Sequence, residues 1–135
     1  MKILYLSNWK EKKLPTKEIE TTLKQLGHKV ESIDDQTFDI KEVIEKGNKS
    51  DMILFHEGGV PATSQMDMNL GLLGLKRVLA NLKCRKVFWF PYKVWALNEL
   101  WMESVIPDID YGFLNDGTWV RRHKYDNLFH LPFGC

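Results

Sequence analysis

The sequence predicts an α/β fold, a three-layer α/β/α Rossmann-like domain with a mostly parallel sheet of about six strands. First, short apolar runs that favour strands alternate along the chain with segments whose apolar residues recur at helical spacing. Second, the runs at 51–56 and 87–90 have apolar centres without a charge, as in strands covered by helices on both faces. Third, 135 residues without a repeat or a Gly/Ser linker indicate one domain, spanning 1–135.

The predicted strands are short apolar runs that end at a polar residue or a turn former. They cover 2–7, 28–33, 51–56, 87–90, 111–114 and 128–131. In the second run, Val30 and Ile33 are diluted by charged and polar residues, which favours a position at the edge of the sheet. We therefore expect the strand order 2-1-3-4-5-6. In that order the winding of the chain reverses between the first and third strands, where such sheets usually bind ligands.

Four helices are predicted between these strands. The first begins at Pro15 and ends at Gly27, and its residues Ile19, Leu23 and Leu26 line one face. The others cover 40–47, 68–82 and 97–104, and the 68–82 segment has the clearest pattern, with Met68, Leu72, Leu75, Leu79 and Leu82 spaced by four and three residues.

The segment after the fifth predicted strand has no helical periodicity. Residues 115–117, Asn-Asp-Gly, are typical of a turn. The basic cluster 121–124 beside Trp119 and Tyr125 has the composition of a solvated connecting segment, with a phosphate or an acidic membrane surface as the alternative ligand.

Composition and charge exclude several classes of protein. A hydrophobic content of 44% excludes a disordered chain. Nineteen basic and eighteen acidic residues leave a net charge of +1, which gives no electrostatic footprint for DNA, so we expect no nucleic-acid partner. Two cysteines without a disulfide framework, and no recognisable signal peptide, favour the cytoplasm. The four histidines stand at no zinc-ligand spacing with a cysteine or with one another, so we expect no metal site and no cofactor.

The candidate site residues follow the carboxyl ends of the strands, which meet at one rim of a parallel sheet. They are Ser7, Asn8, His56, Glu57, Gly58, Gly59, Tyr92, Lys93, Asn115 and Asp116. Glu57 has the chemistry of a general base if it is partly buried, or of a solvated loop carboxylate if it is not. His56 ends an apolar strand, which favours a buried, satisfied histidine over a catalytic one. Gly58-Gly59 fits either a tight turn or a close backbone approach to a ligand.

Several motifs of α/β proteins are absent from the sequence. It contains no G-x-G-x-x-G, no G-x-x-x-x-G-K-[ST] and no G-x-S-x-G. This argues against a dinucleotide-binding fold, a P-loop nucleoside triphosphatase and an α/β-hydrolase.

The whole chain resembles the N-terminal half of a GT-B glycosyltransferase. The similarity lies in the opening strand 1–7 with the helix 18–27, in Leu26-Gly27-His28-Lys29-Val30 leading into the second strand, and in 110–119 followed by the Leu131-Pro132-Phe133-Gly134 segment. The strands at 50–55 and 86–90 match the middle of such domains.

The resemblance implies the acceptor-binding half of an enzyme that transfers a sugar from an activated donor. The nucleotide-sugar donor would be held by a second Rossmann-like domain, so we expect this chain alone to be inactive. The implied partners are a sugar or glycan acceptor and that second domain. Glu57 is the implied catalytic base or hydroxyl-orienting carboxylate, with His56 as the next candidate. The remaining rim residues, among them Asn8, Gly58, Gly59 and Asp116, would line the acceptor side.

Two other interpretations remain open. In one, the chain is a stand-alone Rossmann-like module that binds a ligand or a partner without catalysis. In the other, rim aromatics meet another chain, as in a homodimer. These aromatics are Trp9, Tyr92, Trp95 and Trp119.

Overall fold

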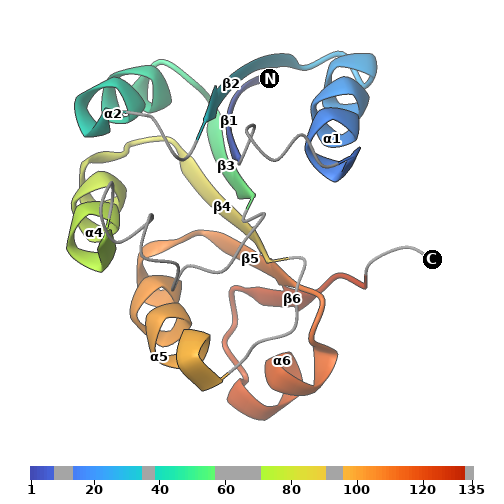
Figure 1. Ribbon diagram of the computed structural model, residues 1–135, viewed down its shortest axis with the longest axis vertical. Helices are drawn as coiled ribbons and strands as arrows, with labels where there is room; N and C mark the ends of the chain where they lie inside the picture. Colours follow the sequence, from blue (N-terminus) through green and yellow to red (C-terminus); the bar gives the residue numbers. More distant parts are fainter. Residues whose placement is uncertain (8–13, 35–38, 57–70, 91–95, 133–135) are drawn as a thin grey trace.

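A six-stranded parallel sheet forms the centre of the protein (Figure 1). The computed structural model describes residues 1–7, 14–34, 39–56, 71–90 and 96–132. The strand order is β2-β1-β3-β4-β5-β6, and every neighbouring pair is parallel, so the predicted fold class and strand order are confirmed. The strands are β1 (Lys2–Ser7), β2 (Lys29–Asp34), β3 (Met52–His56), β4 (Arg85–Phe90), β5 (Tyr111–Leu114) and β6 (Leu128–His130).

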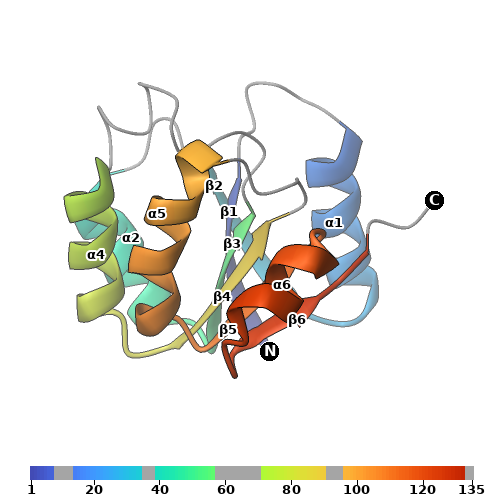
Figure 2. The ribbon, with the colours of Figure 1, turned by 90° about the horizontal axis from the view of Figure 1, so that it is seen from below.

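Helices cover the sheet on both sides (Figure 2). On one side lies α1 (Leu14–Gln25), and on the other lie α2 (Ile40–Asn48), α4 (Gly71–Asn81) and α5 (Ala96–Val105). A 3-10 turn at Ile106–Asp108 follows α5, and α6 (Gly117–His123) lies between β5 and β6 in the sequence.

The core is divided by the sheet into two hydrophobic clusters. The larger one joins the sheet to α2, α4, α5 and α6, and it contains Phe88, which stacks on Phe55 at 4.3 Å and on Phe90 at 5.4 Å between ring centroids. The smaller one lies under α1, whose Ile19 and Leu23 pack against it. The central strand β3 is buried along most of its length, and β4 is buried at Val87, Phe88 and Phe90, as their apolar sequences predict.

The four predicted helices are confirmed as α1, α2, α4 and α5, with one correction at the end of α1. Gly27 has a φ of +85° directly after α1, and the amide of His28 donates to the carbonyl of Leu23, so the predicted glycine stop is confirmed. Leu26, expected on the apolar face, is instead 67% exposed, because the helix ends at Gln25 and the chain turns away. Of the 68–82 helix, the structure describes 71–81, and Leu75 and Leu79 are buried as predicted.

The prediction of a connecting segment after β5 is wrong, because this segment forms the helix α6. Asp116 caps its first turn: Oδ1 accepts hydrogen bonds from the amides of Thr118 and Trp119 at 3.1 and 3.0 Å. Lys124 ends the helix in the left-handed region, with a φ of 49°. Trp119 is 4% exposed and belongs to the larger cluster, so its predicted role as an exposed interface anchor is also wrong.

Replacing Asp116 with alanine should lower the free energy of unfolding by about 1 kcal/mol, because two amides of the first turn lose their acceptor. Urea denaturation at pH 7 measures this change. Asp116→Asn keeps an oxygen acceptor at the same position, so it should stay close to wild type. Equal losses in both variants would contradict the capping role.

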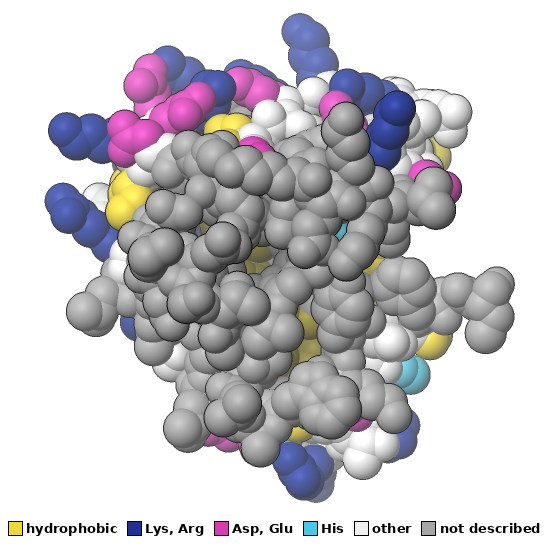
Figure 3. All heavy atoms as spheres, viewed as in Figure 1, with side chains coloured by type: hydrophobic (Ala, Val, Ile, Leu, Met, Phe, Trp, Pro, Cys, Tyr) yellow, Lys and Arg dark blue, Asp and Glu magenta, His cyan; other side chains and the backbone are white. Residues whose placement is uncertain are grey.

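Basic and acidic side chains mix on the surface over α2. Figure 3 shows Lys or Arg beside Asp or Glu there, and Lys46 forms ion pairs with both Glu31 and Glu42. In the described part of the chain, no helix is both long and apolar enough to cross a bilayer.

Candidate functional site

The candidate site lies where β1 and β3 end side by side. Ser7 is the last residue of β1, and His56 is the last of β3. The flanking strands β2 and β3 lie on opposite sides of β1, so the winding of the chain reverses here. In open α/β sheets, the crevice beyond the strand ends at this reversal is the usual place for a ligand.

Three aromatic rings lie together near the carboxyl ends of β1, β3 and β4. The hydroxyl of Tyr5 lies 2.8 Å from Nδ1 of His56, and both side chains are buried. The imidazole of His56 also stacks on Trp89 of β4, with 5.0 Å between ring centroids. We call Tyr5, Ser7, His56 and Trp89 the switch-point cluster.

Burial determines the protonation of His56. Desolvation lowers the pKa of this imidazole from an ordinary 6.5 to about 4. The ring is therefore neutral at pH 7, with one nitrogen donating and the other accepting. Its contact with Tyr5 through Nδ1 leaves Nε2 as the nitrogen that can serve a ligand hydroxyl. A pKa near 4 makes His56 a weak general base at neutral pH, so hydrogen bonding and orientation suit it better than proton abstraction.

Ser7 contributes a buried hydroxyl without a partner among the described residues. Its Oγ has no hydrogen bond within the part of the chain that the structure describes, and the residue is fully buried. Buried polar groups are usually paired, so this hydroxyl marks a position where a polar ligand atom can be received. Ser32 of β2, opposite Tyr5 in the sheet register, also has a buried hydroxyl without a partner among the described residues.

The structure brings some of the predicted site residues together and separates others. Ser7 and His56 lie on adjacent strands. Asn115 and Asp116 follow β5, three strands from β1, which corresponds to about 14 Å across the sheet. The carboxylate of Asp116 is already used to cap α6. The other candidates lie outside the described residues: Asn8, Glu57, Gly58, Gly59, Tyr92 and Lys93.

Sequence reasoning missed Tyr5 as a member of this site. The signal was present, since alternate residues of a strand point to one face and Tyr5 lies two positions before Ser7. Only the strand register between β1 and β3, which the structure provides, places the Tyr5 hydroxyl against His56.

Comparison with known proteins identifies similar folds. No model of a protein family matches the sequence, and no curated protein matches it significantly. An α-glucosyltransferase solved with UDP and a 13-mer DNA containing an HMU base superposes with a TM-score of 0.65 at 11% identity, over 97% of this chain and 42% of that one. An α-glucosyltransferase with UDP-glucose and DNA containing an abasic site gives 0.64 at 15% identity, over 98% and 41%.

A shorter protein also shares the fold. A TIR domain solved as a heterodimer superposes with a TM-score of 0.57 at 12% identity, over 100% of this chain and 86% of that one. At such identities the comparisons establish a Rossmann-like α/β fold, which glycosyltransferase and TIR domains share, and nothing finer. The chain spans about two fifths of the glucosyltransferase length. The expectation of no nucleic-acid partner finds no support here, since those glucosyltransferases were solved with DNA.

Proposed function

We propose that this chain is the N-terminal, acceptor-side domain of a GT-B glycosyltransferase, and that the switch-point cluster lines its acceptor site. The observation that carries the proposal is the buried Ser7 hydroxyl, which has no partner in the described part of the chain and lies beside the neutral His56 where the winding of the sheet reverses. The likeness to an α-glucosyltransferase over nearly the whole chain supports the same assignment. A sugar acceptor offers hydroxyls, which pair with both groups.

An uncovered apolar surface supports the presence of a further domain. On the α1 side of the sheet, Tyr111 and Phe129 are 41% and 43% exposed, and their ring centroids lie 6.2 Å apart. Phe113 lies 5.8 Å from Phe129 and extends this β5–β6 aromatic face. Contiguous exposed aromatics of this kind mark interaction sites. A second domain, or a partner chain, fits this surface.

The proposed roles follow from the chemistry. Ser7 and His56 would hydrogen-bond and orient the acceptor, together with Asn8, Gly58, Gly59, Tyr92 and Lys93 from the loops. Glu57 would be the base that takes the proton of the attacking hydroxyl. A nucleotide-sugar donor such as UDP-glucose would be held by the second domain. DNA belongs among the acceptors to be tested, because the similar glucosyltransferases were solved with it.

The alternative function is a stand-alone binding module. The observation that favours it is the TIR domain, a fold of similar length that aligns with the whole of this chain over 86% of its own length. In this alternative the switch-point cluster binds a ligand, or the β5–β6 aromatic face binds a partner, without catalysis.

A binding experiment separates the two functions. We would titrate the isotope-labelled chain with three probes and follow the amide signals by NMR: a DNA duplex containing an HMU base, a malto-oligosaccharide and UDP-glucose. The acceptor domain should respond to one of the first two, at Ser7 and His56, and this response should be lost in Ser7→Ala. Ser50→Ala is the matched control and should bind as wild type, because its hydroxyl lies just before β3, at the opposite end of the sheet, and donates to the carbonyl of Lys46. A response to UDP-glucose alone at these residues would favour the binding module, and no response to any probe would overturn the acceptor assignment.

In a transferase that contains this domain, Glu57→Ala should lower the turnover number at least about tenfold with folding intact. The loss follows from removing the base that activates the acceptor hydroxyl. Steady-state transfer assays measure it, and circular dichroism checks the fold. Glu45→Ala, an exposed carboxylate on α2, serves as the control. Unchanged turnover in Glu57→Ala would remove this residue from the site.

A further inference from the structure

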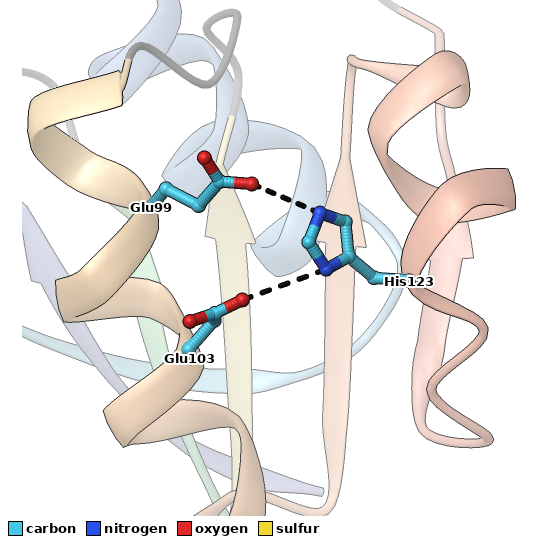
Figure 4. A group of neighbouring side chains, drawn as sticks. All are labelled: Glu99, Glu103 and His123. Atoms are coloured by element: carbon cyan, nitrogen blue, oxygen red, sulfur yellow. Dashed lines mark ion pairs between the residues drawn. The ribbon is translucent and has the colours of Figure 1, made fainter.

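A second cluster of ionisable side chains joins α5 to α6, away from the switch-point cluster. Glu99 and Glu103 lie one turn apart on α5, and His123 of α6 points between them (Figure 4). Nε2 of His123 lies 2.9 Å from Oε1 of Glu99, and Nδ1 lies 3.5 Å from Oε1 of Glu103. All three side chains are partly buried.

This arrangement places two carboxylates around one imidazole. A neutral imidazole carries one N–H, yet both ring nitrogens of His123 face a carboxylate oxygen. The ring nitrogen without the proton therefore sets a lone pair toward a carboxylate oxygen, and the guanidinium of Arg122 is the positive group that faces this contact among the described residues. In addition, Glu99 and Glu103 are like charges at i,i+4 on one helix, and such pairs repel.

The surroundings hold the three groups in place. The ring of His123 stacks on Trp119, with 4.0 Å between centroids. The indole nitrogen of Trp119 donates to Oε1 of Glu99 at 3.0 Å, and this hydrogen bond is the main cause that lowers the pKa of that carboxyl. Hydrogen bonds of this kind to a ligating carboxylate are typical of the outer shell of metal sites.

We infer that Glu99, Glu103 and His123 form a binding site for a divalent cation of the Zn²⁺ class. One imidazole and two carboxylates are a ligand set that Zn²⁺ accepts, whereas Mg²⁺ favours oxygen alone. Three protein ligands leave a coordination position for water or for a substrate atom. The spacing of histidines and cysteines in the sequence could not predict this site. Its ligands are one histidine and two glutamates, and both glutamates precede the histidine by twenty or more residues.

Arg122 competes with the ion for Glu99. Its Nη2 lies 2.8 Å from the Oε1 atom that contacts His123, and its Nε lies 3.3 Å from Nε2 of His123. With a neutral imidazole, the cluster and Arg122 together carry one net negative charge. Removing Arg122 should therefore increase the affinity for a dication, while removing a ligand should decrease it.

The test is calorimetric titration of the full chain with ZnCl₂ after treatment with EDTA, with the thermal midpoint as a second measurement. Zn²⁺ should bind at one site and raise the Tm, because it links α5 to α6 in the folded state. His123→Gln and Glu103→Gln should each weaken binding at least tenfold, and Arg122→Gln should strengthen it. His130→Gln and Glu45→Gln, which change an exposed histidine and an exposed glutamate elsewhere, should bind as wild type.

Two results would overturn the inference. If wild type takes up no Zn²⁺, these three side chains do not form a metal site. If binding survives in His123→Gln and Glu103→Gln, Zn²⁺ is held elsewhere in the chain. The experiment is independent of the proposed transferase, since it follows only the metal and the Tm.

Discussion

Lowering the pH from 7 to 4 should remove about 3 kcal/mol of the free energy of unfolding through His56 alone. Burial holds the pKa of this imidazole at about 4 in the folded protein, against 6.5 in an unfolded chain. The unfolded state therefore binds more protons between these two values, and stability falls as the pH drops through this window. Each pKa unit is equivalent to about 1.4 kcal/mol. Above pH 6.5 the contribution is fully present.

Urea denaturation at pH 7, 6, 5 and 4 measures this dependence. The comparison with His56→Gln isolates the contribution of His56 from the rest of the pH dependence. The wild-type curve should be steeper than that of His56→Gln, and the difference should grow toward pH 4. His130→Gln, which changes an exposed histidine on β6, should keep the wild-type slope. Parallel curves for wild type and His56→Gln would show that this imidazole is not held neutral by burial.

The fold was predictable because its signals are local. The unbroken apolar residues of β3 and β4 imply helices on both faces, and the diluted Val30 and Ile33 place β2 at the edge, which is enough to favour one strand order. Gly27 fixes the end of α1 by its left-handed conformation. The helix α6 gave no such signal, because it has only seven residues and its stability comes from the Asp116 cap and the buried Trp119.

The sites were less predictable because they depend on contacts between distant segments. The rule that ligands bind beyond the strand ends selects Ser7 and His56, but not Tyr5, whose hydroxyl reaches His56 across 51 residues of sequence. The same rule selects Asn115 and Asp116, which lie three strands away. The glutamates of α5 and His123 meet only because α6, a helix that the sequence pattern did not predict, folds onto α5.

Replacing Phe88 with alanine should lower the free energy of unfolding by about 3–5 kcal/mol. Phe88 is 2% exposed in the middle of β4, and its ring stacks between Phe55 and Phe90. Truncation removes the transfer free energy of the ring and leaves a cavity that the neighbouring strands, fixed by the sheet, cannot close. Because the stability of a domain is typically 5–15 kcal/mol, this one change should remove a large part of it. Urea denaturation at pH 7 gives the difference.

Phe129→Ala is the matched control, since it removes the same ring from the β5–β6 aromatic face, where Phe129 is 43% exposed. We expect this change to cost less than about 1 kcal/mol in the isolated chain, because most of the lost contact is with water. Similar losses in the two variants would contradict the exposure of the β5–β6 aromatic face in the isolated chain. If Phe129→Ala becomes as costly as Phe88→Ala only when a second domain or partner is present, the aromatic face is the surface that this partner covers.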